Sequence, residues 1–188
     1  MDSFRWLAVA LSILLGLGVT RLLSALIDVF RSRSQARPDW VPLTWAGCIF
    51  LWQIQYWWAI EELPSLVKVW TMGSFLILVG LALLLFAAAS LILPAARLGA
   101  GASYRAEFER DGRWALVALS AYFVLALVTD WLFWGVSPLS RWGVYLAGLI
   151  VLPLVSAWSP SRRVVEAITV LYVPLSIAAI LELSPAAY

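Results

Sequence analysis

Six long apolar runs dominate this sequence and limit what the chain can fold into. A helix needs about 20 apolar residues to cross a bilayer core about 30 Å thick. We therefore expect an all-α fold, a polytopic membrane protein in which residues 1–188 form a single integral membrane domain, a six-transmembrane-helix bundle. The expected spans cover approximately residues 4–30, 41–60, 69–93, 114–134, 139–158 and 164–183, with a charged linker over residues 97–113.

The composition excludes several classes of protein. Hydrophobic residues make up 63% of the chain and charged residues 13%, about half the charge of a typical soluble domain. A soluble enzyme, a nucleic-acid-binding protein and a disordered protein are therefore excluded. The chain has no histidine and a single cysteine, Cys48, so histidine-based catalysis and histidine or thiolate metal sites are not available. We expect no enzymatic activity, no cofactor and no metal.

The basic residues predict an orientation, because Lys and Arg are retained on the cytoplasmic side of a membrane. The linkers after the first, third and fifth spans hold nine of them, whereas the N-terminus and the linkers after the second and fourth spans hold three. We expect a bacterial inner (plasma) membrane protein with both termini outside. Ten of the 12 tryptophans fall at predicted span ends, where the indole ring prefers the headgroup level. Trp45 and Trp52 fall inside a span.

Small and polar residues recur every four positions in the first span, and this spacing places them along one face of a helix. In lipid, helices associate by close approach along small side chains. The pattern predicts a helix-packing face, with the lining of a groove or pore as the alternative. The partner helix can belong to this chain or to a second copy. The predicted face consists of Ala8, Ser12, Gly16, Thr20 and Ser24.

Two segments of the chain resemble each other. Residues 5–12 read RWLAVALS and residues 113–120 read RWALVALS. A duplication would give two halves of three spans, and an odd number of spans forces the halves into opposite orientations, as in transporters built from inverted repeats. Chance similarity between apolar segments is the alternative.

Arg21 is the most costly residue of the first span. It lies about 14 Å from the predicted cytoplasmic end, close to mid-membrane, and it stays protonated at a cost of about 2.5–3.5 kcal/mol. Asp28 on the same span, and Glu166 and Thr169 on the last span, enter from the same side. These residues predict a cytoplasm-facing polar pocket for translocation. In the alternative interpretation Arg21 snorkels to the headgroups. Arg21→Leu should leave unchanged or improve the stability of a scaffold, provided that no acidic partner is stranded, and it should abolish flux in a carrier.

A second polar group is expected toward the outside. Gln53 and Gln55 lie in the later half of the second span, and Asp130 lies near the outer end of the fourth. Glutamine side chains in membranes commonly form hydrogen bonds between helices. A buried Asp130 could instead exchange a proton, because burial favours the neutral carboxyl group.

Two functions follow from these patterns. The first is a small carrier or channel for a solute, ion or proton, which uses the polar pocket around Arg21. The second is a non-catalytic structural or accessory subunit, or scaffold, of a larger membrane complex. In both cases the expected partners are the lipid bilayer and either further copies of the chain or another membrane protein. A small-molecule or ion substrate belongs to the first function, and neither function involves nucleic acid.

Overall fold

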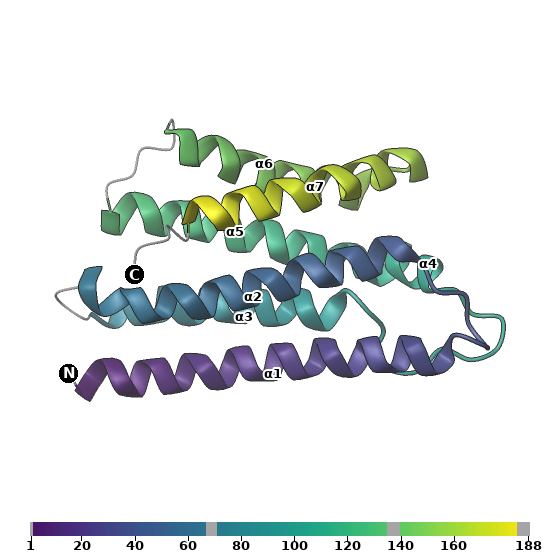
Figure 1. Cartoon of the computed structure of the whole chain (residues 1–188), viewed down its shortest axis with the longest axis horizontal. Helices are drawn as coiled ribbons and strands as arrows, with labels where there is room; N and C mark the ends of the chain where they lie inside the picture. Colours follow the sequence, from purple (N-terminus) through teal and green to yellow (C-terminus); the bar gives the residue numbers. More distant parts are fainter. Residues whose placement is uncertain (1, 67–70, 135–139, 184–188) are drawn as a thin grey trace.

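The computed structural model describes residues 2–66, 71–134 and 140–183 of the chain, and these residues form a helical bundle (Figure 1). Apart from one isolated parallel bridge between Arg37 and Ser103, no β-pairing occurs in the described residues. The elements are α1 (Asp2–Ser32), α2 (Trp40–Leu66), α3 (Met72–Leu91), α4 (Tyr104–Glu107), the π-helix η1 (Phe108–Gly112), α5 (Arg113–Trp134), α6 (Arg141–Trp158) and α7 (Arg162–Leu183).

The all-helical prediction is confirmed, and the long helices α1, α2, α3, α5, α6 and α7 fit the six expected runs. Residues 69–70 and 139, at the starts of two predicted spans, lie outside the described residues. Several helices are long and apolar enough to cross a membrane, which indicates a membrane-embedded protein. These segments are Trp6–Ser32, Met72–Leu91, Tyr104–Trp131 and Arg162–Glu182, and α6 contributes a shorter apolar helix.

The expected linker over residues 97–113 is only partly a linker. Its second half is helical, because α4 continues through η1 directly into α5. Its first half turns at Gly101, where φ is 83°, a conformation that glycine adopts without steric cost. The Gly101 amide donates to the Gln35 carbonyl oxygen at 3.3 Å, and the Arg37 amide donates to the Ala102 carbonyl oxygen at 3.3 Å. The segments that follow α1 and α3 are thus joined to each other.

The long helices alternate in direction, so the half formed by α1, α2 and α3 runs opposite to the half formed by α5, α6 and α7 (Figure 1). The segments 33–39, 92–103 and 159–161 gather at one end of the bundle, which we call the linker end. The first residues of α1 and the last residues of α7 lie at the opposite end. Helix α1 packs on α2 and α3, α5 lies between α3 and α6, and α7 packs on α2 and α6.

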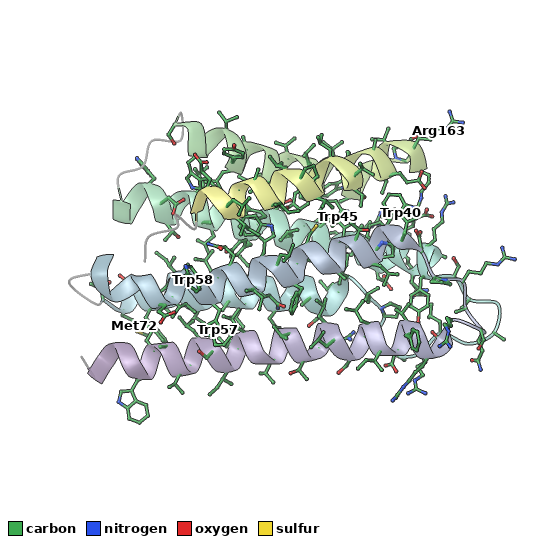
Figure 2. The ribbon with its side chains drawn as sticks, in the orientation of Figure 1. Trp40, Trp45, Trp57, Trp58, Met72 and Arg163 are labelled. Carbon is green, nitrogen blue, oxygen red and sulfur yellow. The ribbon has the colours of Figure 1, made fainter. Side chains whose placement is uncertain are left out.

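The tryptophans of α2 divide between surface and core. Trp40, Trp57 and Trp58 are exposed toward the two ends of the helix, whereas Trp45 and Trp52 are buried. Figure 2 shows Trp40 near the linker end, and Trp57 and Trp58 toward the opposite end. The exposed rings are those at predicted span ends, and the buried rings are the two inside the predicted span.

Helix α1 packs in this chain through a different face from the predicted one. Residues Gly16, Thr20 and Ser24 of the predicted face are exposed, and Ala8 and Ser12 are half-buried. The face that contacts α2 and α3 is mostly leucine, and such side chains fill the space between packed helices. A partner outside this chain stays a prediction for the small-residue face. The buried residues are Leu7, Leu11, Leu15, Gly18, Leu22, Ala25 and Val29.

Of the two glycines in α1, Gly18 is the one that lies against neighbouring helices. A methyl group at Gly18 would collide with the side-chain amide nitrogen (Nε2) of Gln53 and lie 3.6 Å from the Phe86 Cα. A methyl group at Gly16 would meet nothing within 4 Å. Alanine favours a helix by about 1 kcal/mol over glycine, and overpacking costs about 1–3 kcal/mol. Both variants gain the same helix propensity, so we expect the Gly18→Ala protein to be less stable than the Gly16→Ala protein by the overpacking cost alone, about 1–3 kcal/mol. Unfolding in detergent micelles, followed by circular dichroism, measures this difference, and equal stabilities would contradict the close approach.

Candidate functional site

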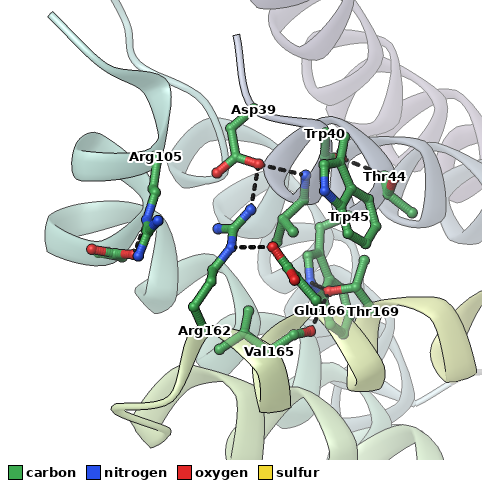
Figure 3. Close-up of polar contacts among 11 residues, drawn as sticks. Asp39, Trp40, Thr44, Trp45, Arg105, Arg162, Val165, Glu166 and Thr169 are labelled. Carbon is green, nitrogen blue, oxygen red and sulfur yellow. Dashed lines mark hydrogen bonds and ion pairs between the residues drawn. The ribbon is translucent and has the colours of Figure 1, made fainter. Parts of the chain in front are cut away.

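An ion cluster at the linker end joins the start of α2 to the start of α7 (Figure 3). Asp39 precedes α2, and its Oδ1 accepts a hydrogen bond from the Val41 amide at 3.1 Å, as expected of a residue that caps a helix N-terminus. The same oxygen accepts from Nη2 of Arg162 at 2.6 Å. One turn along α7, Oε1 of Glu166 accepts from Nε of Arg162 at 2.7 Å. A single guanidinium group therefore holds two carboxylates, one immediately before α2 and one on α7.

The cluster is largely shielded from the surroundings. The exposed fraction is 7% for the Asp39 side chain and 18% for the Arg162 side chain. Oδ2 of Asp39 and Nη1 of Arg162 are buried and have no hydrogen-bond partner within the described residues. Buried polar atoms in proteins are nearly always hydrogen-bonded. The cluster thus keeps one acceptor, Oδ2 of Asp39, and one donor, Nη1 of Arg162, that no other described group satisfies.

Below the ion cluster, the contact between α2 and α7 is lined by hydrogen-bonded tryptophans. Nε1 of Trp45 donates to Oγ1 of Thr169 at 3.0 Å, and Nε1 of Trp52 donates to Oγ of Ser176 at 3.4 Å. The ring centroids of Trp45 and Tyr172 also lie 4.4 Å apart. These two indoles, which the sequence places inside a span, are therefore interior packing groups with their N–H groups satisfied.

Arg21 binds the end of α3. Its Nη2 donates to the carbonyl oxygens of Ser90 at 3.3 Å and Leu93 at 3.2 Å. In a continuing helix the Ser90 carbonyl would accept from the amide of residue 94, but residue 94 is proline and has no N–H. Arg21 supplies the missing donor, and positive charge is favourable at a helix C-terminus.

The residues predicted to form one translocation pocket occupy separate contacts. Asp28 pairs with Arg97, its Oδ1 lying 2.7 Å from Nε of Arg97. Glu166 pairs with Arg162, and Thr169 accepts from Trp45. Arg21 contacts backbone carbonyls at the end of α3. The structure therefore does not bring Arg21, Glu166 and Thr169 together.

The second predicted group is dispersed as well. Gln53 is 1% exposed and lies against Gly18, and neither its Oε1 nor its Nε2 has a hydrogen-bond partner in the described part of the chain. Oδ2 of Asp130 accepts a hydrogen bond from Nε1 of Trp142 at 2.8 Å, which links α5 to α6. Gln55 is buried. Of the three side chains, Asp130 makes a contact between helices, and that contact involves neither glutamine.

Sequence reasoning missed two members of the ion cluster and the partner of Asp28. Asp39 and Arg162 lie at predicted span ends, where charged residues are usually exposed to water. The usable signal was Asp39 immediately before an apolar run, which is the pattern of a helix N-cap. No comparable pattern marks Arg97 as the partner of Asp28.

No group of three or more His, Cys, Asp or Glu side chains suited to a metal ion occurs within residues 2–66, 71–134 and 140–183. Comparison with protein-family models, with curated proteins and with solved structures finds no match to this chain. The function must therefore be inferred from the contacts themselves.

Proposed function

We propose that this chain is a non-catalytic structural or accessory subunit of a membrane assembly, with six helices crossing a bacterial inner membrane. The observation that carries the proposal is that costly polar groups form contacts between helices. Arg21 joins α1 to the end of α3, Arg162 joins α7 to the start of α2, and Asp130 joins α5 to α6. Contacts between helices give each of these costly groups a structural role, and this supports the subunit proposal.

The proposed orientation places the linker end in the cytoplasm and both termini outside. The helices alternate in direction, so that the segments after α1, α3 and α6 share one end of the bundle (Figure 1). Nine of the chain's 13 basic residues lie in these segments, in the last turn of α1, along α4 and η1, or at the first residues of α5 and α7. An excess of Lys and Arg in short linkers is the pattern of cytoplasmic loops.

The proposed contact surface toward a partner is the small-residue face of α1. Gly16, Thr20 and Ser24 are exposed in this chain, and small residues let helices approach closely in lipid. The partner is either a second copy of the chain or another membrane protein. Exposed leucine and isoleucine side chains such as Leu17 and Ile27 flank the face and would add contact area.

A carrier or channel is the second candidate function, and Gln53 is the observation that favours it. A fully buried amide with no hydrogen-bond partner in the described residues is costly in an apolar interior. A polar solute that passes between α1, α2 and α3 would supply the missing partner. This function would require Gln53, rather than Arg21 and Glu166 acting together, to contact the solute.

Photo-crosslinking in native membranes tests the subunit proposal. In a Cys48→Ala background, Ser24→Cys places a photoreactive maleimide on the small-residue face, and Val170→Cys places it on an exposed apolar face of α7. We expect a crosslinked protein adduct at position 24 and none at position 170, because only the first face has the small residues that close helix contact requires.

Two results would contradict the subunit proposal. The first is equal crosslinking, or none, at positions 24 and 170. The second is solute flux in vesicles reconstituted with the purified chain, if Gln53→Leu abolishes that flux while the protein stays folded. The second result would establish the carrier function.

A further inference from the structure

Two regions of the linker end carry no net charge. Three arginines and three acidic residues occur over residues 105–113 and offset one another. At the start of α7, two arginines are offset by two carboxylates, one of which Arg162 binds at 2.6 Å. These four residues are Arg162, Arg163, Asp39 and Glu166. Neither region therefore has an excess of positive charge that would attract an anion.

The end of α1 carries the excess positive charge of the linker end. Arg31, Arg33 and Arg37 lie within seven consecutive residues, and all three are exposed. None of them forms an ion pair within the described residues. Asp28, in the last turns of α1, is already paired with Arg97 at 2.7 Å. The three arginines therefore form a basic patch whose charge is not offset, which we call the α1 patch.

Hydrogen bonds hold the backbone beneath the α1 patch. The chain turns tightly after α1, because the Gln35 and Ala36 amides both donate to the Ser32 carbonyl oxygen, at 2.8 and 2.9 Å. The hydroxyl groups of Ser32 and Tyr104 are hydrogen-bonded at 2.7 Å, and the Tyr104 amide donates to the Arg37 carbonyl oxygen at 3.3 Å. The arginines thus extend from a turn that is fixed to α4, so less backbone entropy is lost when the patch binds a partner.

The α1 patch follows directly on a side of α1 that faces out of the bundle. Helix α1 packs on α2 and α3 and forms one edge of the bundle (Figure 1). Leu23, Ile27 and Phe30 are exposed, at a spacing that places them along one side of the helix. The guanidinium group of Arg33 lies 4.0 Å from the centroid of the Phe30 ring. In a membrane these apolar side chains contact lipid tails, and the arginines beside them reach the headgroups of the same lipids.

We propose that the α1 patch binds the phosphate groups of anionic phospholipids in the leaflet next to the linker end. Guanidinium groups stay charged and form strong hydrogen bonds with phosphate oxygens, and basic clusters beside a membrane helix attract anionic lipids. A lipid fits better than a soluble anion, because the apolar side of α1 contacts its acyl chains as well. The inference rests on the membrane placement in the proposed function, but not on the partner of the small-residue face.

Lipid selection by the full-length protein tests the α1 patch. The protein is reconstituted into nanodiscs with equal amounts of phosphatidylglycerol and phosphatidylcholine, and the lipids that it retains are counted by native mass spectrometry. The test variant combines Arg31→Gln, Arg33→Gln and Arg37→Gln. The matched control removes the same charge from exposed residues elsewhere at the linker end, and it combines Arg105→Gln, Arg110→Gln and Arg163→Gln.

We expect the wild type to retain phosphatidylglycerol in preference to phosphatidylcholine. The test variant should lose about tenfold or more of this preference, because each arginine near a membrane surface contributes about fivefold. The control should keep the wild-type preference. Salt at about 1 M should weaken the wild-type preference, because it shortens the screening length to about 3 Å.

Equal losses in the test variant and the control would overturn the proposal, because the total charge of the protein would then explain the effect. Equal retention of both lipids by the wild type would overturn it as well. In that case a protein adduct from a photoreactive maleimide at Ser34→Cys, in a Cys48→Ala background, would assign the patch to an acidic protein. If the test variant does not fold, Arg37→Gln alone decides the matter, with an expected loss of about fivefold. None of these results changes the crosslinking expected at position 24, so the subunit proposal is tested separately.

Discussion

Replacing Arg162 with leucine is expected to lower the free energy of unfolding by about 3–5 kcal/mol. Asp39 is 7% exposed and accepts the Arg162 hydrogen bond at 2.6 Å. Without that guanidinium, its carboxylate becomes an uncompensated charge at the start of α2. Glu166, which is half-exposed, can turn toward water and contributes less to the loss. Unfolding of the purified protein in micelles, followed by circular dichroism, measures the effect.

Two further variants distinguish the loss of the buried ion pair from the general effect of removing a positive charge. Arg163 is the next residue of α7 and is exposed, and Figure 2 shows it at the outer rim of the linker end. Arg163→Leu should therefore change stability by no more than about 0.5 kcal/mol. Combining Asp39→Asn with Arg162→Leu should recover part of the loss, because asparagine still caps a helix and carries no charge. Equal losses for Arg162→Leu and Arg163→Leu would contradict a structural role of the cluster.

Arg21→Leu is expected to lower the free energy of unfolding by about 2–3 kcal/mol. The change removes a charge from the membrane interior, which by itself would favour the protein. It also strands the Ser90 and Leu93 carbonyl oxygens, which Arg21 binds at 3.3 and 3.2 Å. Unsatisfied backbone groups cost several kcal/mol where water is excluded, so the second effect should dominate. The same unfolding assay measures the net change in the free energy of unfolding.

An arginine just after α1, Arg33, controls for this second prediction. Arg33 also donates to a backbone carbonyl, that of Phe30 at 2.8 Å, but this contact is exposed. We expect Arg33→Leu to have little effect, since water can replace the lost donor. Arg21→Lys should be intermediate, because an ammonium keeps the charge but lacks the planar fork of donors. An Arg21→Leu protein as stable as the wild type would favour the snorkelling interpretation.

Helix number and approximate helix limits could be predicted because each depends on a long local apolar run. The packing face of α1 could not. Two faces of this helix are compatible with lipid, one of leucines and one of small residues, and hydrophobicity does not choose between them when the surroundings are also apolar. Gly18, on the buried face, resembles Gly16 in sequence, and only the approach of Gln53 and Phe86 distinguishes the two positions.

The polar contacts were less predictable, because side chains were expected to pair with side chains. Arg21 was correctly identified as a residue that needs an acceptor, but its acceptors are backbone carbonyls near the end of α3. Pro94 offered a signal, since a proline four residues after Ser90 leaves that carbonyl without its helical donor. The partners of Asp28 and Glu166 depend on how the linkers fold back, which local sequence does not determine.

The contact between Arg21 and α3 has a consequence for how the protein is made. The carbonyls of Ser90 and Leu93 follow Arg21 by 69 and 72 residues, which takes a ribosome several seconds to synthesise, at about 5–20 residues per second. During that interval the guanidinium has no acceptor from α3 and must stay hydrated, near the lipid headgroups or in the aqueous insertion channel. The contact that joins α1 to the end of α3 therefore forms only after α3 has been synthesised.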